Sequence, residues 1–202
     1  MKRYIPISLI IFRLLLAPTI IVITYYLREN AKIIVMVLMY LGLISDILDG
    51  VVARHLKISS AKLRRYDSQT DLVFWHSIGV ATWMLYPELI SNNSIPIILL
   101  FVMEAACYFV SIIKFGKETC THAFLSKFWG ISLLAAFTSL IGFSYAGFLF
   151  AVAIILGLIS QLDVILIILI LPEWTHDIPS CYHAYLIRKG VRFKRNKFLN
   201  DD

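Results

Sequence analysis

Residues 33–54 read IIVMVLMYLGLISDILDGVVAR, an apolar run of membrane-spanning length that nevertheless contains Asp46 and Asp49. A second acidic pair, Asp67 and Asp71, follows in the segment DSQTD. On insertion scales, an aspartate near the middle of a spanning helix costs about 2.5 to 3.5 kcal/mol. Ionisable residues inside membrane segments are therefore read as functional by default. These four aspartates are the candidate functional site of the chain.

The composition around the aspartates predicts a membrane protein. Of 202 residues, 59% are hydrophobic and 16% are charged, whereas soluble domains carry roughly 25% charged residues. A span needs about 20 apolar residues, and the sequence offers windows at 6–27, 33–52, 71–90, 95–113 and 128–171. The last window is too long for one helix and is expected to divide near residues 143–147. The sequence therefore predicts an all-α integral membrane protein with six transmembrane helices.

The chain is expected to form a single membrane-embedded domain over 1–202, in which 172–202 is a basic juxtamembrane tail. The first window is read as a retained span, because it is long, contains Arg13 and lacks a small-residue cleavage site. Three cysteines without paired spacing indicate neither a disulfide framework nor a thiolate metal site.

The basic residues predict the orientation. In a six-span arrangement every Lys and Arg falls on one side, except Arg13, Arg28 and Lys32. The positive-inside rule then places both termini and the acidic pairs on the cytoplasmic side. The basic tail is expected to contact anionic lipid headgroups, and no nucleic-acid partner is expected.

The aspartate spacing points to metal chemistry. Separations of three and four residues place each pair on one helix face, and two adjacent helices then bring four carboxylates together. Two divalent cations would cancel four negative charges, and Mg²⁺ or Mn²⁺ suits all-oxygen ligands. Gly50 and Ala53 have small side chains, which leave room for a ligand to approach the helix. The planar guanidinium of Arg54 presents N–H donors in a fork geometry that matches the oxygens of a phosphate.

The acidic segment also carries a family resemblance. The CDP-alcohol phosphatidyltransferases have the pattern D-x2-D-G-x2-A-R-x8-G-x3-D-x3-D. The chain matches it at full spacing through Asp46, Asp49, Gly50, Ala53, Arg54, Asp67 and Asp71. It departs at Leu63, where the family has a glycine. The opening segment PISLIIFRLLLAP also looks like the usual first span of the family.

The resemblance implies a six-helix enzyme, usually homodimeric, with a pocket facing the cytoplasm. Such an enzyme takes a CDP-linked lipid donor, here expected to be CDP-diacylglycerol, and an alcohol acceptor attacks it to release CMP. In this family Asp46, Asp49 and Asp67 would bind the metal ions. Asp71 would contribute to the metal site and accept the proton of the acceptor hydroxyl.

Several further polar residues admit two interpretations each. Arg13 either snorkels to the headgroups or points inward to hold an acceptor phosphate. His122 and Lys127 either bind the acceptor headgroup or belong to an interfacial loop. For Glu104, Gln161 and Asp163, packing in the bundle interior is favoured over substrate contact.

Three alternatives to the transferase stay open at this point. The aspartates could be an ion-paired helix end, with Arg54, Arg64 and Arg65 as partners. A divalent-cation transporter also needs intramembrane carboxylates, although it would distribute them through the membrane depth. A catalytically inactive family-derived protein that binds nucleotide or lipid is the third, and the Leu63 departure favours it.

Overall fold

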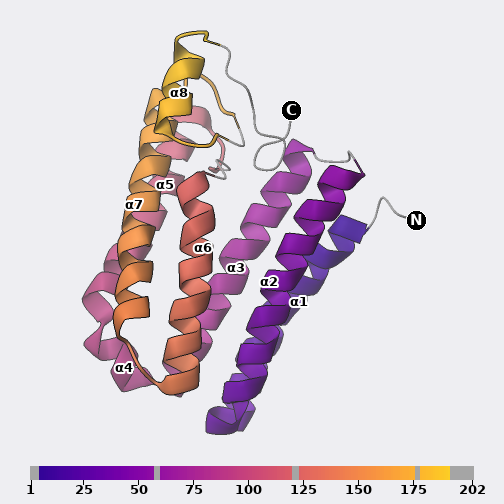
Figure 1. Cartoon of the computed structure of the whole chain (residues 1–202), viewed down its shortest axis with the longest axis vertical. Coiled ribbons are helices and arrows are strands. Elements are labelled where there is room, and N and C mark those ends of the chain that lie inside the picture. Colours follow the sequence, from indigo (N-terminus) through magenta and orange to yellow (C-terminus); the bar gives the residue numbers. More distant parts are fainter. Residues whose placement is uncertain (1–4, 57–59, 120–122, 176–177, 192–202) are drawn as a thin grey trace. The chain divides into compact units, whose positions relative to one another are not determined.

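Every described element in the computed structural model is a helix (Figure 1). The structure describes residues 5–56, 60–119, 123–175 and 178–191, and these ranges contain no strand. The chain divides into two compact units. The first comprises Met1–Asn92 with Leu134–Gly147, and the second comprises Asn93–Leu133 with Phe148–Asp202.

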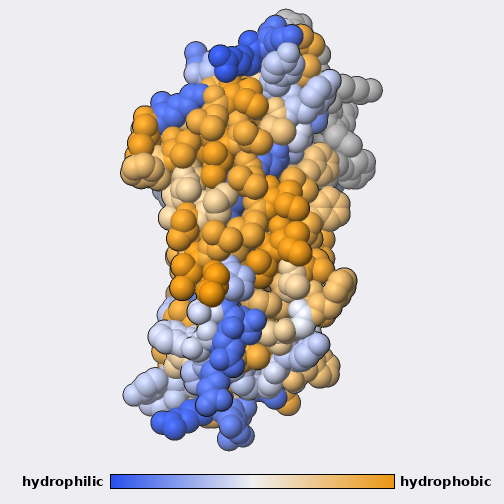
Figure 2. Space-filling model, turned by 90° about the vertical axis from the view of Figure 1, so that its left-hand side faces the viewer, coloured by the Kyte–Doolittle hydropathy of each residue, from blue (hydrophilic) through white to orange (hydrophobic). Residues whose placement is uncertain are grey.

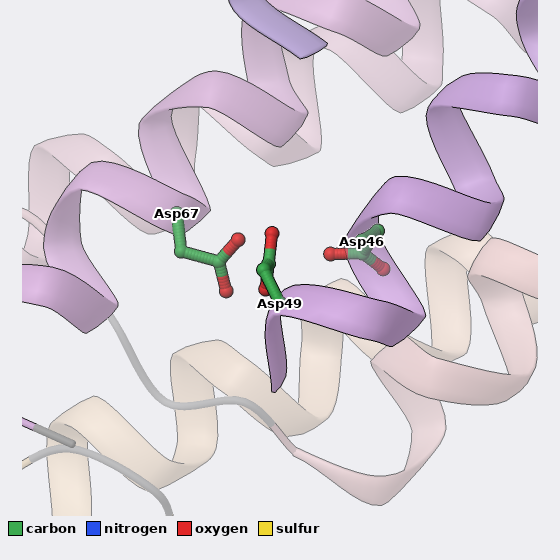
Figure 3. A group of neighbouring side chains, drawn as sticks. All are labelled: Asp46, Asp49 and Asp67. Carbon is green, nitrogen blue, oxygen red and sulfur yellow. The ribbon is translucent and has the colours of Figure 1, made fainter. Parts of the chain in front are cut away.

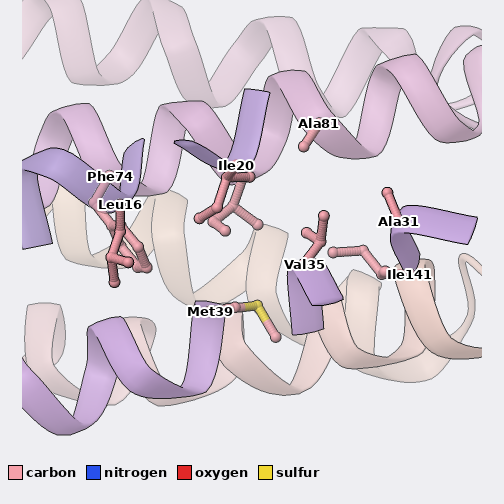
Figure 4. Packing of buried hydrophobic residues seen from close by; sticks show 9 residues of the cluster. Leu16, Ile20, Ala31, Val35, Met39, Phe74, Ala81 and Ile141 are labelled. Carbon is pink, nitrogen blue, oxygen red and sulfur yellow. The ribbon is translucent and has the colours of Figure 1, made fainter. Parts of the chain in front are cut away.

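The first unit is built on three long helices, α1 (Ile5–Leu27), α2 (Lys32–His55) and α3 (Ala61–Leu85). A 3₁₀ turn, η2 (Arg28–Ala31), joins α1 to α2, and a short helix, α4 (Pro87–Asn92), follows α3. Helix α1 packs along both α2 and α3. The core between these helices is apolar, and one of its residues lies in the π-helical turn η3 (Thr138–Gly142). Figure 4 shows this core, which consists of Leu16, Ile20, Ala31, Val35, Met39, Phe74, Ile78, Ala81 and Ile141.

Helices α2 and α3 approach each other closely at Gly42. A Cβ atom built on Gly42 would collide with the ring of Phe74, which is buried on α3. Gly42 lies one helical turn before Asp46, and Phe74 lies about one turn after Asp71. The close contact therefore fixes the spacing of the two helices beside the acidic residues.

The second unit contains α5 (Ser94–Phe115), α7 (Phe148–Ile170), α8 (Cys181–Arg188) and most of α6 (Phe124–Phe137). Helix α7 packs on α5 and α8. The Lys114 amine donates to three carbonyls at the end of α7, those of Ile168, Leu169 and Leu171. Figure 2 shows apolar side chains gathered on the side where α5 and α7 lie, and many of these side chains are exposed, as lipid contact requires.

Within the part of the chain that the structure describes, four helical stretches are long and apolar enough to cross a membrane: Ile5–Ala53, Ser94–Phe115, Phe124–Gly142 and Phe148–Ile170. The first contains α1 and the part of α2 that ends at Ala53. The predicted break near residues 143–147 is confirmed, because α7 begins at Phe148 after a non-helical segment.

The third predicted window, residues 71–90, has the wrong bounds. Helix α3 begins at Ala61, where the Ser60 side chain accepts a hydrogen bond from the Leu63 N–H, and it ends at Leu85, before Pro87. The early turns of α3 are rich in charge, so a search for apolar residues does not detect them as helix. The short helix α8 was likewise not predicted within the basic tail.

Candidate functional site

Four aspartates from two helices form the candidate site, and we call Asp46, Asp49, Asp67 and Asp71 the aspartate cluster. Asp46 and Asp49 lie near the end of α2, and Asp67 and Asp71 lie in the early turns of α3. The three- and four-residue spacings place each pair on one helix face, as predicted. Figure 3 shows the carboxylates of Asp46, Asp49 and Asp67 turned toward one another.

The carboxylates lie close enough together to hold a metal ion. One oxygen from each of Asp46, Asp49 and Asp67 lies within 4.8 Å of the other two. Asp49 is buried, whereas the side chains of Asp46 and Asp71 are about one-third exposed. Carboxylate oxygens are the ligands that Mg²⁺ and Mn²⁺ prefer, so the donor set fits a hard divalent cation.

All four aspartates form ion pairs with Arg13, which lies on α1. Its Nη2 donates to Asp49 Oδ2 over 2.8 Å and to Asp67 Oδ1 over 2.5 Å. Its Nη1 donates to Asp46 and Asp71. Arg13 is completely buried, so the interpretation in which it snorkels to the headgroups is wrong. It points inward, and its partners are the carboxylates.

The ion-pair alternative considered from the sequence did not include Arg13 among the partners of the aspartates. It assigned the partners to arginines close in sequence to the aspartates, whereas Arg13 comes from a different helix. The signal that marks Arg13 is its charge within an otherwise apolar span, the same signal that marks the aspartates. The sequence alone does not say that these charges meet.

The candidate donor-binding residues lie on the same part of α2. Gly50 follows Asp49 directly and is half-buried, and Ala53 is buried. The Arg54 side chain lies outside the described residues. A role for these three residues in binding the nucleotide diphosphate stays a prediction.

Leu63, the departure from the family pattern, lies in the first turn of α3. Its N–H donates to the Ser60 hydroxyl over 3.2 Å, which makes it part of the helix cap. Its backbone is helical, and it is not among the residues with positive φ. A glycine is therefore not needed here for an unusual backbone conformation, and the difference that remains is the bulk of the leucine side chain.

The other candidate polar residues belong to the second unit. Lys127 is exposed on α6, with its amine over the Phe124 ring, and His122 lies outside the described residues. Asp163 Oδ1 accepts a 3.0 Å hydrogen bond from the Cys181 N–H, joining α7 to the start of α8. This contact agrees with the interior-packing interpretation of Asp163.

A comparison with protein-family models matches residues 3–175 to the CDP-alcohol phosphatidyltransferase model. Neither the curated proteins nor the solved structures gave a match to the chain. The matched range includes Arg13 and the whole aspartate cluster. Members of this family are membrane enzymes that transfer a phosphoalcohol group from a CDP-alcohol in lipid biosynthesis. The chain belongs to the CDP-alcohol phosphatidyltransferase family.

Proposed function

We propose that this enzyme transfers the phosphatidyl group of CDP-diacylglycerol to an acceptor alcohol and releases CMP. The observation that carries the proposal is the convergence of four carboxylates, at the family spacing, on one buried cation. Their oxygens surround a positive charge, as they would surround divalent metal ions. The membrane character of the chain suits a lipid-linked donor.

Asp46, Asp49, Asp67 and Asp71 would hold two Mg²⁺ or Mn²⁺ ions. The proximity of three carboxylate oxygens and the four negative charges of the cluster support this number and type of ion. When bound, the ions neutralise the charge of the diphosphate and acidify the acceptor hydroxyl.

Asp71 is the proposed general base. Its partly exposed carboxylate accepts the proton of the acceptor hydroxyl. The acceptor oxygen then bonds to the phosphorus that carries the lipid, and the bond from that phosphorus to the CMP oxygen breaks. Gly50 and Ala53 leave room for the donor beside Asp49, and Arg54 pairs with its diphosphate.

His122 and Lys127, on the proposed cytoplasmic side of the chain, are the proposed acceptor-recognition residues. The proposed topology has six spans, α1, α2, α3, α5, α6 with η3, and α7, with both termini and the site facing the cytoplasm. The distribution of Lys and Arg supports this orientation. We also propose a homodimer, on the basis of the family resemblance, which a mass measurement in detergent would test.

The test is an assay of CMP release by purified protein. CDP-diacylglycerol is supplied with a panel containing glycerol phosphate, inositol phosphate and serine, in the presence of Mg²⁺ or Mn²⁺. We expect metal-dependent CMP formation with one acceptor, accompanied by the matching phospholipid. Absence of CMP across the panel, from protein shown to be folded, would contradict the proposal.

A further inference from the structure

We infer that Arg13 is an internal counter-cation of the aspartate cluster, and that its guanidinium competes with divalent cations for the same carboxylate oxygens. This inference rests on the proposed function, which assigns divalent cations to these four aspartates. It assigns to Arg13 a role in setting metal affinity, in place of a role in binding substrate.

The contacts of Arg13 are distributed evenly over the cluster. Nη1 joins Asp46 of α2 to Asp71 of α3, and Nη2 joins Asp49 of α2 to Asp67 of α3. Each terminal nitrogen therefore connects the two acid-bearing helices. Without a cation among them, four carboxylates at this separation would repel one another. One guanidinium from α1 thus keeps them together.

A metal ion and the guanidinium exclude each other from this position. Mg²⁺ binds carboxylate oxygens at about 2.0 to 2.1 Å and requires near-octahedral geometry. Arg13 Nη2 lies 2.5 Å from Asp67 Oδ1 and 2.8 Å from Asp49 Oδ2, so it occupies space beside the oxygens that a metal would use. Repulsion between a guanidinium and a divalent cation adds to this steric conflict. Metal entry therefore requires the guanidinium to withdraw.

Arg13 is held by the cluster alone among the described residues. Its buried Nε has no hydrogen-bond partner, although a guanidinium offers five donors. Helix α1 contains no acidic residue that could hold the side chain elsewhere. Among the described residues, the guanidinium is therefore held in place by the same carboxylate oxygens that a metal ion would bind. A metal ion that binds these oxygens would release the side chain.

Metal affinity measured directly would test the competition. Full-length protein in nanodiscs is titrated with Mn²⁺, and free Mn²⁺ is followed by its paramagnetic resonance signal. Arg13→Gln removes the charge and is expected to bind Mn²⁺ more tightly, by about 5- to 150-fold, the usual range for coupled ligands. Arg13→Lys keeps the charge but has a single terminal nitrogen, so its Mn²⁺ affinity should lie between those of wild type and Arg13→Gln. Arg28→Gln, a charge loss on an exposed residue, is the matched control.

Thermal unfolding gives a second readout. In EDTA, Arg13→Gln should melt below wild type, because its carboxylates repel without a counter-charge. Saturating Mn²⁺ should then raise its melting temperature by more than it raises that of wild type, since tighter binding stabilises the folded state more. Arg28→Gln should follow wild type in both conditions.

The outcomes separate the inference from the proposed function. Saturable Mn²⁺ binding by wild type, with equal or weaker binding by Arg13→Gln, overturns the inference and leaves the metal enzyme standing. No saturable binding by either protein overturns both. If Arg13→Gln does not fold, a structure of the wild-type protein with bound Mn²⁺ would test the competition instead. A guanidinium still bonded to Asp49 and Asp67 beside the bound metal would contradict the competition.

Discussion

Arg13 and Asp49 lie 36 positions apart in the sequence and are joined by a 2.8 Å hydrogen bond from Nη2 to Oδ2. Their side chains are 1% and 5% exposed. Buried charges are tolerated when they are paired and hydrogen-bonded, so this contact ties α1 to α2 at the site. Helix α1 therefore contributes to the candidate site, although the family motif lies wholly in the α2–α3 segment.

Asp71→Asn is expected to abolish turnover while leaving donor binding partly intact. The amide cannot accept the proton of the acceptor hydroxyl, and general-base catalysis typically contributes about 10²- to 10⁴-fold. The rate of CMP release and the binding of CDP-diacylglycerol would be measured in parallel. Glu88→Gln, the same chemical change on an exposed residue of α4, should retain the wild-type rate. Undiminished turnover by Asp71→Asn would remove Asp71 as the base.

Asp49→Asn is expected to weaken metal binding directly. Asp49 is the most buried member of the cluster, and its oxygen belongs to the close group of three. Losing a ligand should cost more than the roughly 10- to 100-fold that loss of an outer-shell partner costs. Mn²⁺ titration would measure the change.

EDTA should stop wild-type activity, and added Mg²⁺ or Mn²⁺ should restore it. Activity that persists in EDTA would contradict metal dependence.

Gly42→Ala is expected to destabilise the first unit and to lower activity. The new methyl group would meet the buried Phe74 ring and push α2 away from α3, which separates the two acidic pairs. Overpacking of this kind costs about 1 to 3 kcal/mol. Gly79→Ala is the matched control, because a Cβ there meets nothing within 4 Å, and it should be neutral or slightly stabilising. Thermal unfolding in detergent would compare them, and equal melting temperatures would contradict the close contact.

Cys181 provides a test of the α7–α8 contact. Hydrogen bonding to Asp163, burial and the charge of Asp163 raise the pKa of the Cys181 thiol above its ordinary value. A raised pKa keeps the thiol protonated at pH 8. Asp163→Asn removes the charge but keeps an oxygen that can accept the Cys181 N–H. The thiol pKa should therefore fall, and alkylation at pH 8 should become faster.

The alkylation rate would be measured against pH in a chain whose other two cysteines, Cys107 and Cys120, are replaced by serine. Glu173→Gln, a charge loss at an exposed position before α8, is the control and should leave the profile unchanged. If the Asp163→Asn protein and the protein that retains Asp163 give the same alkylation rates across the pH range, the carboxylate does not act on the thiol.

The limits of the sequence prediction are clearest in α3 and α1. Apolar windows located α1, α2 and α5 well, because in lipid a helix must satisfy its own backbone and present an apolar surface. They misplaced the start of α3, because its early turns carry charges and its beginning at Ser60 is set by a side-chain cap. The same windows located Arg13 within α1 but said nothing of its partners.

The sequence by itself determined the membrane character of the chain, the break before α7 and the membership of the aspartate cluster. These features depend on composition and on helical spacing, which are local properties. Only the tertiary structure decided that Arg13 meets all four aspartates, because this contact arises where α1 packs along α2 and α3. No spacing rule relates a residue on one helix to the charges on two others, so the counter-cation became visible only once the helices were packed.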